Sequence, residues 1–119
     1  MTSQTDLQTF LPLSSAVLHI LLALAEGERH GYAIMQQATT LSSGKLQLGP
    51  GTLYRSIKRL LADGLIEETE KRSDPALDDQ RRRYYRLTSL GEQVLTLEIE
   101  RLSHLVQVAK KRGFDGNPA

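Results

Sequence analysis

Cysteine is absent from this chain of 119 residues. Without it there is no disulfide framework, and no thiolate can act as a metal ligand or a nucleophile. The absence of disulfides fits a reducing compartment. The three histidines, His19, His30 and His104, lie on separate elements, and none is spaced with acidic residues as metal ligands usually are. We therefore expect no metal site and no cofactor.

Long apolar segments are also missing. The longest apolar run, residues 16–25, contains a histidine and is too short to cross a bilayer, which takes about 20 apolar residues. The first ten residues, MTSQTDLQTF, have no basic region ahead of an apolar one, unlike a signal peptide. The sequence therefore predicts a cytoplasmic protein with no membrane partner.

The motifs of common enzyme classes do not occur either. Residues 49–51 (GPG) are not followed by the Gly-Lys-Ser/Thr of a phosphate-binding loop, and no serine lies in a nucleophile-elbow pattern. The carboxylates fall mostly in surface-type runs such as residues 67–70 (EETE). We expect no catalytic residues and no enzymatic activity.

Positive charge is scarce overall but unevenly distributed. The net charge of +1 does not by itself indicate a nucleic-acid-binding protein. Residues 1–44 carry a net charge of −2 and residues 87–119 balance at zero, whereas residues 45–86 hold ten Lys or Arg against seven Asp or Glu, a net charge of +3. The excess positive charge therefore lies in the middle of the chain.

That middle segment contains a helix, which we expect to begin at Pro50 and to end at Gly64. One apolar stripe is formed at i, i+4, i+7 and i+8 by Leu53, Ile57, Leu60 and Leu61. The other faces carry hydroxyls, an aromatic ring and three cations: Thr52, Tyr54, Arg55, Lys58 and Arg59. A helix with this division of faces favours an acidic partner, and DNA is the partner we predict.

These five side chains suit different DNA contacts. Arg55 and Arg59 are candidates for reading bases, since arginine can bond the O6 and N7 atoms of guanine together; the alternative is that they contact phosphates or only solvate the surface. Lys58 suits a phosphate, because its ammonium is a point charge. The hydroxyls of Thr52 and Tyr54 can donate hydrogen bonds to phosphates near the helix N-terminus. For Tyr54, a half-buried packing role is an equally good alternative.

The rest of the chain predicts a mainly α fold with a small β-hairpin, namely a winged helix-turn-helix followed by a long helix. Helices are expected from about residue 12 or 14 to 26 and over 31–41, ahead of the basic helix. Period-two patterns at 65–71 and 81–87, joined by a turn-rich segment, predict the wing. We expect four regions: a mobile arm at 1–11 that can include a short helical turn, a DNA-binding domain at 12–87, a helix at 88–112 and a tail at 113–119.

Further DNA contacts are expected from the wing and from the start of the second helix. The return strand of the wing begins with Arg81, Arg82 and Arg83, which can lie along the flanking backbone or in the minor groove. The alternative is a solvated run balanced by nearby aspartates. Gly31 and Tyr32 open the second helix, whose backbone amides can hold a phosphate; the alternative is a turn glycine and a packing tyrosine.

The last helix is longer than a small domain can cover. About 24 residues span some 36 Å, and the first helix is apolar nearly all round. A second copy of the chain, packed about a two-fold axis, can cover both the last helix and the second apolar side of the first helix. The residues predicted at this dimer interface are Leu18, Leu22, Leu95, Ile99, Leu102 and Val106.

Three short motifs together resemble the PadR family of bacterial winged-helix transcriptional regulators, in its shorter form with a single C-terminal helix. They are residues 30–34 (HGYAI), residues 51–66, with GTLYR at their start and GLI at their end, and residues 83–88 (RYYRLT). The resemblance covers residues 13–112. It implies a homodimer that binds an inverted-repeat DNA operator and often represses transcription.

Two further points concern the regulatory role. Some PadR-family members release DNA on binding a small aromatic or drug-like ligand, and some of these stack the ligand on a tryptophan of the C-terminal helix. This chain has no tryptophan, so the resemblance transfers no ligand pocket, and a small-molecule effector stays of unknown identity. The alternative function is a winged-helix protein-interaction module without a specific operator, which the low net charge favours.

Overall fold

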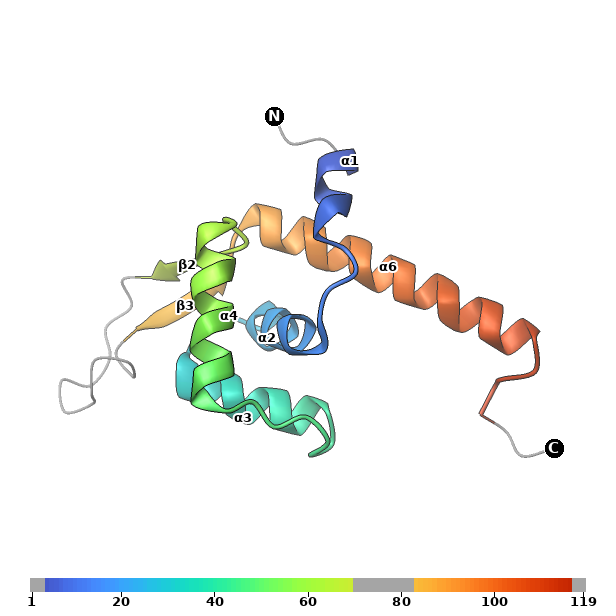
Figure 1. Cartoon of the computed structure of the whole chain (residues 1–119), viewed down its shortest axis with the longest axis horizontal. Helices are drawn as coiled ribbons and strands as arrows, with labels where there is room; N and C mark the ends of the chain where they lie inside the picture. Colours follow the sequence, from blue (N-terminus) through green and yellow to red (C-terminus); the bar gives the residue numbers. More distant parts are fainter. Residues whose placement is uncertain (1–3, 70–82, 117–119) are drawn as a thin grey trace.

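The computed structural model describes residues 4–69 and 83–116. Four long helices and a small sheet form the fold (Figure 1). In chain order the elements are α1 (Gln4–Leu7), η1 (Gln8–Phe10), α2 (Ser15–Ala25), β1 (Arg29–His30), α3 (Gly31–Leu41), α4 (Pro50–Ala62), β2 (Ile66–Thr69), β3 (Tyr84–Leu87) and α6 (Ser89–Lys111). The predicted fold class, a winged helix-turn-helix with a long C-terminal helix, is confirmed.

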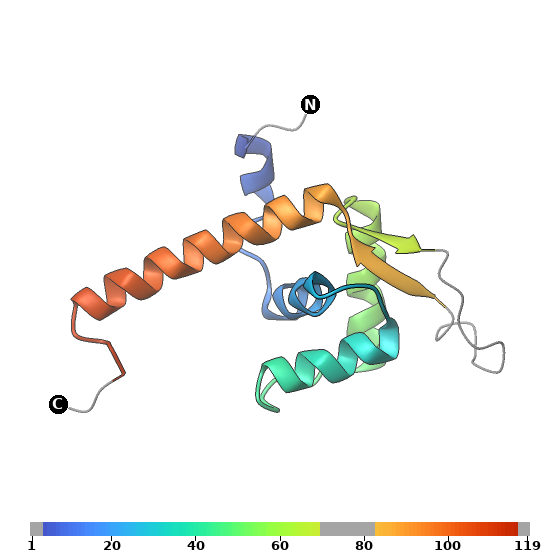
Figure 2. The ribbon, with the colours of Figure 1, turned by 180° about the vertical axis from the view of Figure 1, so that it is seen from behind.

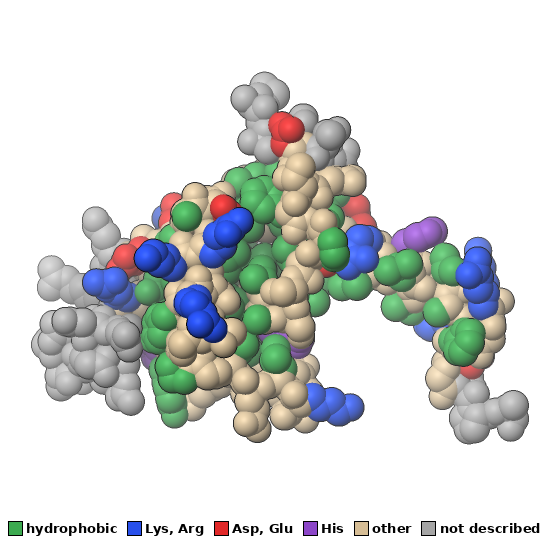
Figure 3. Space-filling view, in the orientation of Figure 1, with side chains coloured by type: hydrophobic (Ala, Val, Ile, Leu, Met, Phe, Trp, Pro, Cys, Tyr) green, Lys and Arg blue, Asp and Glu red, His purple; other side chains and the backbone are tan. Residues whose placement is uncertain are grey.

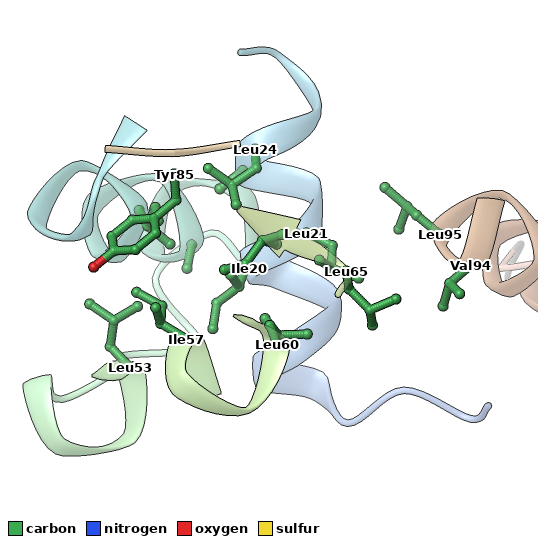
Figure 4. Close-up of a cluster of buried hydrophobic side chains, with 14 of the residues drawn as sticks. Ile20, Leu21, Leu24, Leu53, Ile57, Leu60, Leu65, Tyr85, Val94 and Leu95 are labelled. Atoms are coloured by element: carbon green, nitrogen blue, oxygen red, sulfur yellow. The ribbon is translucent and has the colours of Figure 1, made fainter. Parts of the chain in front are cut away.

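Helix α2 is the centre of the core. Ile20, Leu21 and Ala23 have no solvent exposure, and α2 contacts α3, α4, β3 and α6. Three residues of the predicted α4 stripe belong to this cluster, Leu53, Ile57 and Leu60, and Val94 of α6 completes it (Figure 4). Leu61, the fourth residue of the stripe, is 36% exposed. Because α2 is covered from several sides, its nearly all-round apolar sequence is satisfied largely within one chain.

Side chains cap three of the four long helices. The Ser14 hydroxyl accepts the amide of Val17 at 3.2 Å, and the Thr88 hydroxyl accepts that of Gly91 at 3.0 Å. Helix α4 has no side-chain cap, since Gly49 precedes it, and it begins at Pro50 instead. At its other end Gly64 adopts φ +76°, a left-handed conformation that favours glycine.

The sheet has three antiparallel strands in the order β1-β3-β2. The sequence predicts β2 and β3 as the wing, but it gives no signal for β1. In the structure, Arg29 pairs with Tyr85 and His30 with Tyr84. A two-residue strand has no periodicity, so its pairing depends wholly on the neighbouring strand.

The N-terminal segment, expected as an arm that can include a short helical turn, packs on the core. Residues 4–10 form α1 and η1, and Leu7 is only 5% exposed within the core cluster. Phe10 and Leu11 also pack against that cluster. An apolar surface near α2 and α6 thus orders a segment whose own sequence has no strong helical pattern.

Helix α6 is half buried and half projecting. Its buried residues, Gly91, Val94, Leu95 and Glu98, all lie in the first half. Beyond them the helix extends away from the other elements (Figure 2), and Leu105 and Val106 are about half exposed, at 49% and 50%. No helix in the described part of the chain is long and apolar enough to cross a membrane.

A buried carboxylate anchors α6 at the point where it leaves the core. Glu98 is 1% exposed and accepts the Leu13 amide at 2.8 Å and both Nε and Nη2 of Arg101, at 2.5 and 3.0 Å. The Arg101 hydrogen bond, aided by the Leu13 amide, holds the pKa of Glu98 below its ordinary value, although burial acts the other way. This contact ties the start of α2 to the middle of α6.

Candidate nucleic-acid interface

Helix α4 presents its polar face to solvent. Leu53, Ile57 and Leu60 are at most 2% exposed, which fixes the rotation of the helix. The opposite face is therefore outward, and its exposed side chains are Thr52, Arg55, Lys58 and Arg59. Lysine and arginine side chains follow α4 along the surface (Figure 3).

The cations of α4 differ in how they are held. Arg55 donates from Nη2 to the Thr52 hydroxyl at 3.4 Å, and Arg59 donates from Nε to Oδ2 of Asp63 at 3.2 Å. Among the described residues, no carboxylate lies within 4.0 Å of Arg55 or Lys58. These two cations are the ones available to an anionic ligand without breaking an ion pair.

Tyr54 is half-buried and contacts the start of α3. Its phenol ring and hydroxyl lie against Gly31, leaving no room there for a Cβ atom. The structure thus places Gly31 and Tyr54 in the contact between α3 and α4. Tyr32, the next residue, is 45% exposed beside this contact.

His30 has a structural role that the sequence analysis missed. Its Nδ1 accepts the Ala33 amide at 3.1 Å and so caps α3, while its ring packs edge-on against Tyr84 at 5.4 Å between centroids. Serine, threonine, aspartate and asparagine are the usual capping signals, so a histidine at this position gave no warning.

The wing contributes one described arginine to this side of the molecule. Arg83 is exposed and lies 3.7 Å from Glu68, from Nε to Oε1. Arg81 and Arg82 lie outside the described residues. Arg86 is held by Glu67 at 2.7 Å and by Glu28 at 3.7 Å, and its hydrogen bond with Glu67 raises the pKa of Arg86.

The predicted dimer residues fall into three groups. Leu95 is 8% exposed within the core of its own chain, so its assignment to the dimer interface is corrected. Leu18 and Leu22 are partly buried against the same core. Ile99, Leu102 and Val106, together with Ser103 and Gln107, line an open groove of about 280 Å³ on the projecting half of α6.

Residues 20–97 match the model of the transcriptional regulator PadR-like family. The chain is 37% identical over 90 residues to the transcriptional regulator Rv3488 of Mycobacterium tuberculosis, covering 76% of this chain and 78% of that protein. Within the described ranges, 4–69 and 83–116, no group of three or more His, Cys, Asp or Glu side chains is arranged to hold a metal ion.

Solved structures share the fold. A PadR family transcription regulator from Clostridium difficile superimposes with a TM-score of 0.66 at 23% identity, covering 82% of this chain and 97% of the other. Bacillus subtilis PadR in complex with operator DNA gives a TM-score of 0.63 at 24% identity, covering 74% of this chain and 48% of that protein. At these identities the likeness concerns the fold.

Proposed function

Because the chain belongs to the PadR-like family of transcriptional regulators, which are not enzymes, we propose that it acts by binding a double-stranded DNA operator as a homodimer. The observation that carries the proposal is the outward face of α4. Arg55, Lys58 and Arg59 are exposed along one helix whose opposite face is fully buried. A helix of 13 residues presented in this way fits the major groove.

We assign the individual contacts from the chemistry of each exposed side chain. Arg55 and Arg59 read bases, and Lys58 contacts phosphate. The Thr52 hydroxyl donates a hydrogen bond to a phosphate near the start of α4. Tyr54 serves chiefly to set the angle between α3 and α4 through its contact with Gly31. Tyr32 and Arg83 lie at the flanks, where they contact the DNA backbone, and Arg81 and Arg82 are included on sequence alone.

Dimerisation is supported by the projecting half of α6. Ile99 and Val106 are 40% and 50% exposed, and the groove between them has no cover from the described part of the same chain. A second copy, related by a two-fold axis, buries both grooves at once. It also places two copies of α4 for an inverted-repeat operator with half-sites about one helical turn apart.

Repression follows if this operator overlaps a promoter. A small-molecule or stress signal that alters the packing of α6 would change the separation of the two α4 helices and lower the affinity for the operator. This part of the proposal rests on the architecture: α6 joins the DNA-binding unit, through Glu98 and Leu13, to the dimer contact.

The test begins with selection of genomic fragments by the purified full-length protein. Fluorescence anisotropy then compares the recovered operator with random DNA for wild type, R55A and R59A. Each substitution is expected to weaken operator binding by roughly 5- to 150-fold, because a bidentate arginine–guanine contact contributes about 1–3 kcal/mol of discrimination. Binding to random DNA should weaken much less.

K110A is the matched control, since it also removes one cation but lies at the far end of α6 from α4 (Figure 1). It should bind the operator as wild type does. Equal losses on operator and random DNA would refute base reading by Arg55 and Arg59. If the wild-type protein bound no DNA even at low salt, the proposed function would be wrong, and the protein-interaction alternative would replace it.

A further inference from the structure

The two faces of the β2–β3 hairpin carry different charge arrangements. Register places Glu68 opposite Tyr85 and Glu67 opposite Arg86. Because side chains alternate along a strand, Glu68, Arg83 and Tyr85 share one face, while Glu67 and Arg86 share the other. Tyr85 is 3% exposed and belongs to the core cluster with Leu53 and Ile57 (Figure 4), so the first of these faces is the one turned toward α4.

On the face toward α4, Arg83 lies next to Glu68 and acts on Tyr85. Its Nε lies 3.7 Å from Oε1 of Glu68, and the interaction of Arg83 with Tyr85 favours the ionised phenol. Burial, followed by the charge of Glu68, raises the pKa of Tyr85, while Arg83 acts in the opposite direction. The guanidinium therefore interacts with both groups, on the hairpin face that turns toward α4.

We propose that Glu68 is an internal competitor for DNA: in the free protein it occupies Arg83, and it thereby limits the affinity and the salt dependence of DNA binding. This inference rests on the proposed function. A phosphate that binds Arg83 must either displace the Glu68 carboxylate or lie close to its negative charge. Both lower the favourable free energy that the contact between Arg83 and the phosphate contributes to DNA binding. The Arg83 and Glu68 side chains are 61% and 46% exposed, so a phosphate can reach the pair.

The opposite face supplies a matched control. Glu67 is also a β2 carboxylate paired with a β3 arginine, 2.7 Å from Arg86, and its side chain is likewise 46% exposed. E67Q and E68Q therefore remove the same charge from neighbouring positions of one strand. Arg86 keeps Glu28 as a partner in E67Q, whereas no second carboxylate of the described chain pairs with Arg83 in E68Q.

The experiment measures operator binding by the full-length protein over a range of KCl concentrations for wild type, E67Q, E68Q, R83Q and the double variant E68Q/R83Q. E68Q should tighten binding at low salt by about 2- to 30-fold for two wings. It should also steepen the plot of log K against log [salt] by up to about 2, one phosphate per wing. E67Q should change the affinity by less than about twofold, and the double variant should lose the gain.

Three results would overturn the inference: equal gains in E67Q and E68Q, a gain in E68Q that persists without Arg83, or weaker binding by E68Q. Elution from heparin separates this question from the proposed function. Were the wild-type protein to bind no DNA, the proposed function would fail, yet later elution of E68Q than of E67Q would still show that Glu68 occupies Arg83 against polyanions. Identical elution would overturn that too.

Discussion

Replacing Glu98 by glutamine should destabilise the protein far more than its conservative shape implies. The side chain is 1% exposed and accepts three hydrogen bonds, from Leu13 and Arg101. Glutamine puts an NH₂ group, which cannot accept a hydrogen bond, in the place of one carboxylate oxygen that does accept one. It also leaves Arg101 without a charged partner. Loss of a buried ion-pair partner costs about 3–5 kcal/mol, but Arg101 is 38% exposed and regains water. We therefore expect a loss of about 1–3 kcal/mol in the free energy of unfolding.

For a chain of this size the loss lowers Tm by roughly 4–12 °C. Thermal unfolding followed by circular dichroism at a fixed protein concentration measures it. Glu100, two residues away on α6, is exposed, so E100Q removes the same charge without breaking a buried contact and should shift Tm by no more than about 2 °C. The reasoning would be refuted if E98Q and E100Q shifted Tm equally.

The pH dependence gives a second readout of the same substitution. The Arg101 and Leu13 hydrogen bonds lower the pKa of folded Glu98 below its ordinary value of 4.5. Its stabilising contribution is thus complete above about pH 6, declines as the pH falls through the unfolded value, and is lost below the folded pKa. The Tm difference between wild type and E98Q should narrow from about pH 6 to about pH 3, and a constant difference would contradict this origin.

Two further substitutions test packing and assembly. G91A should lower the free energy of unfolding, measured by chemical denaturation, by about 2 kcal/mol, because a Cβ there collides with the carbonyl oxygen of Leu65. The control G51A, whose Cβ meets nothing within 4 Å, should be neutral or slightly stabilising. Equal effects of the two substitutions would contradict the close approach of Gly91 to Leu65. Size-exclusion chromatography with light scattering should show a dimer for wild type and a monomer for V106D, because this substitution puts a charge into the proposed α6 interface. T96D, on the exposed surface of the first half of α6, should stay dimeric, and a V106D dimer would place the interface elsewhere.

The helices were predictable because their sequence signals are local. Helix α3 spans the predicted residues 31–41, and α4 begins at Pro50 as expected. The last helix was expected over 88–112, and Thr88 at its start caps it, since its hydroxyl accepts a hydrogen bond from the Gly91 amide. In α4 and the last helix a 3.6-residue apolar period meets a proline or a capping threonine, and tertiary contacts do not override these signals.

The missed features depend on contacts between distant residues. Nothing within residues 4–10 shows that Leu7 is buried, because the surface that covers it belongs to other elements. Leu95 and Ile99 share one apolar row of α6, and only the docked position of the helix shows that Leu95 is buried and Ile99 is 40% exposed. Glu98 lies on the same turns of α6. A glutamate three residues before an arginine on a helix is normally exposed, and only the contact with the distant Leu13 amide shows that Glu98 is buried.

The candidate site was predictable in part for the same reason. The outward face of α4 follows from its period, so Arg55, Lys58 and Arg59 were identified without a structure. The partners of the wing arginines were not, because pairing Glu68 with Arg83 and Glu67 with Arg86 requires the strand register. A slip of one residue would exchange the two faces.

The hydrogen bond between Leu13 and Glu98 joins residues 85 positions apart, and this separation bears on how the protein folds during its synthesis. The ribosome makes α2, α3 and α4 well before α6, so the emerging chain has α4, the helix proposed to bind DNA, before it has the helix that completes the core. Val94 has no exposure in the finished fold, and until it arrives α2 keeps an uncovered apolar side. We expect the nascent chain to complete its fold only near the end of translation. Prematurely terminated chains should then be degraded and should not compete for the operator as monomers.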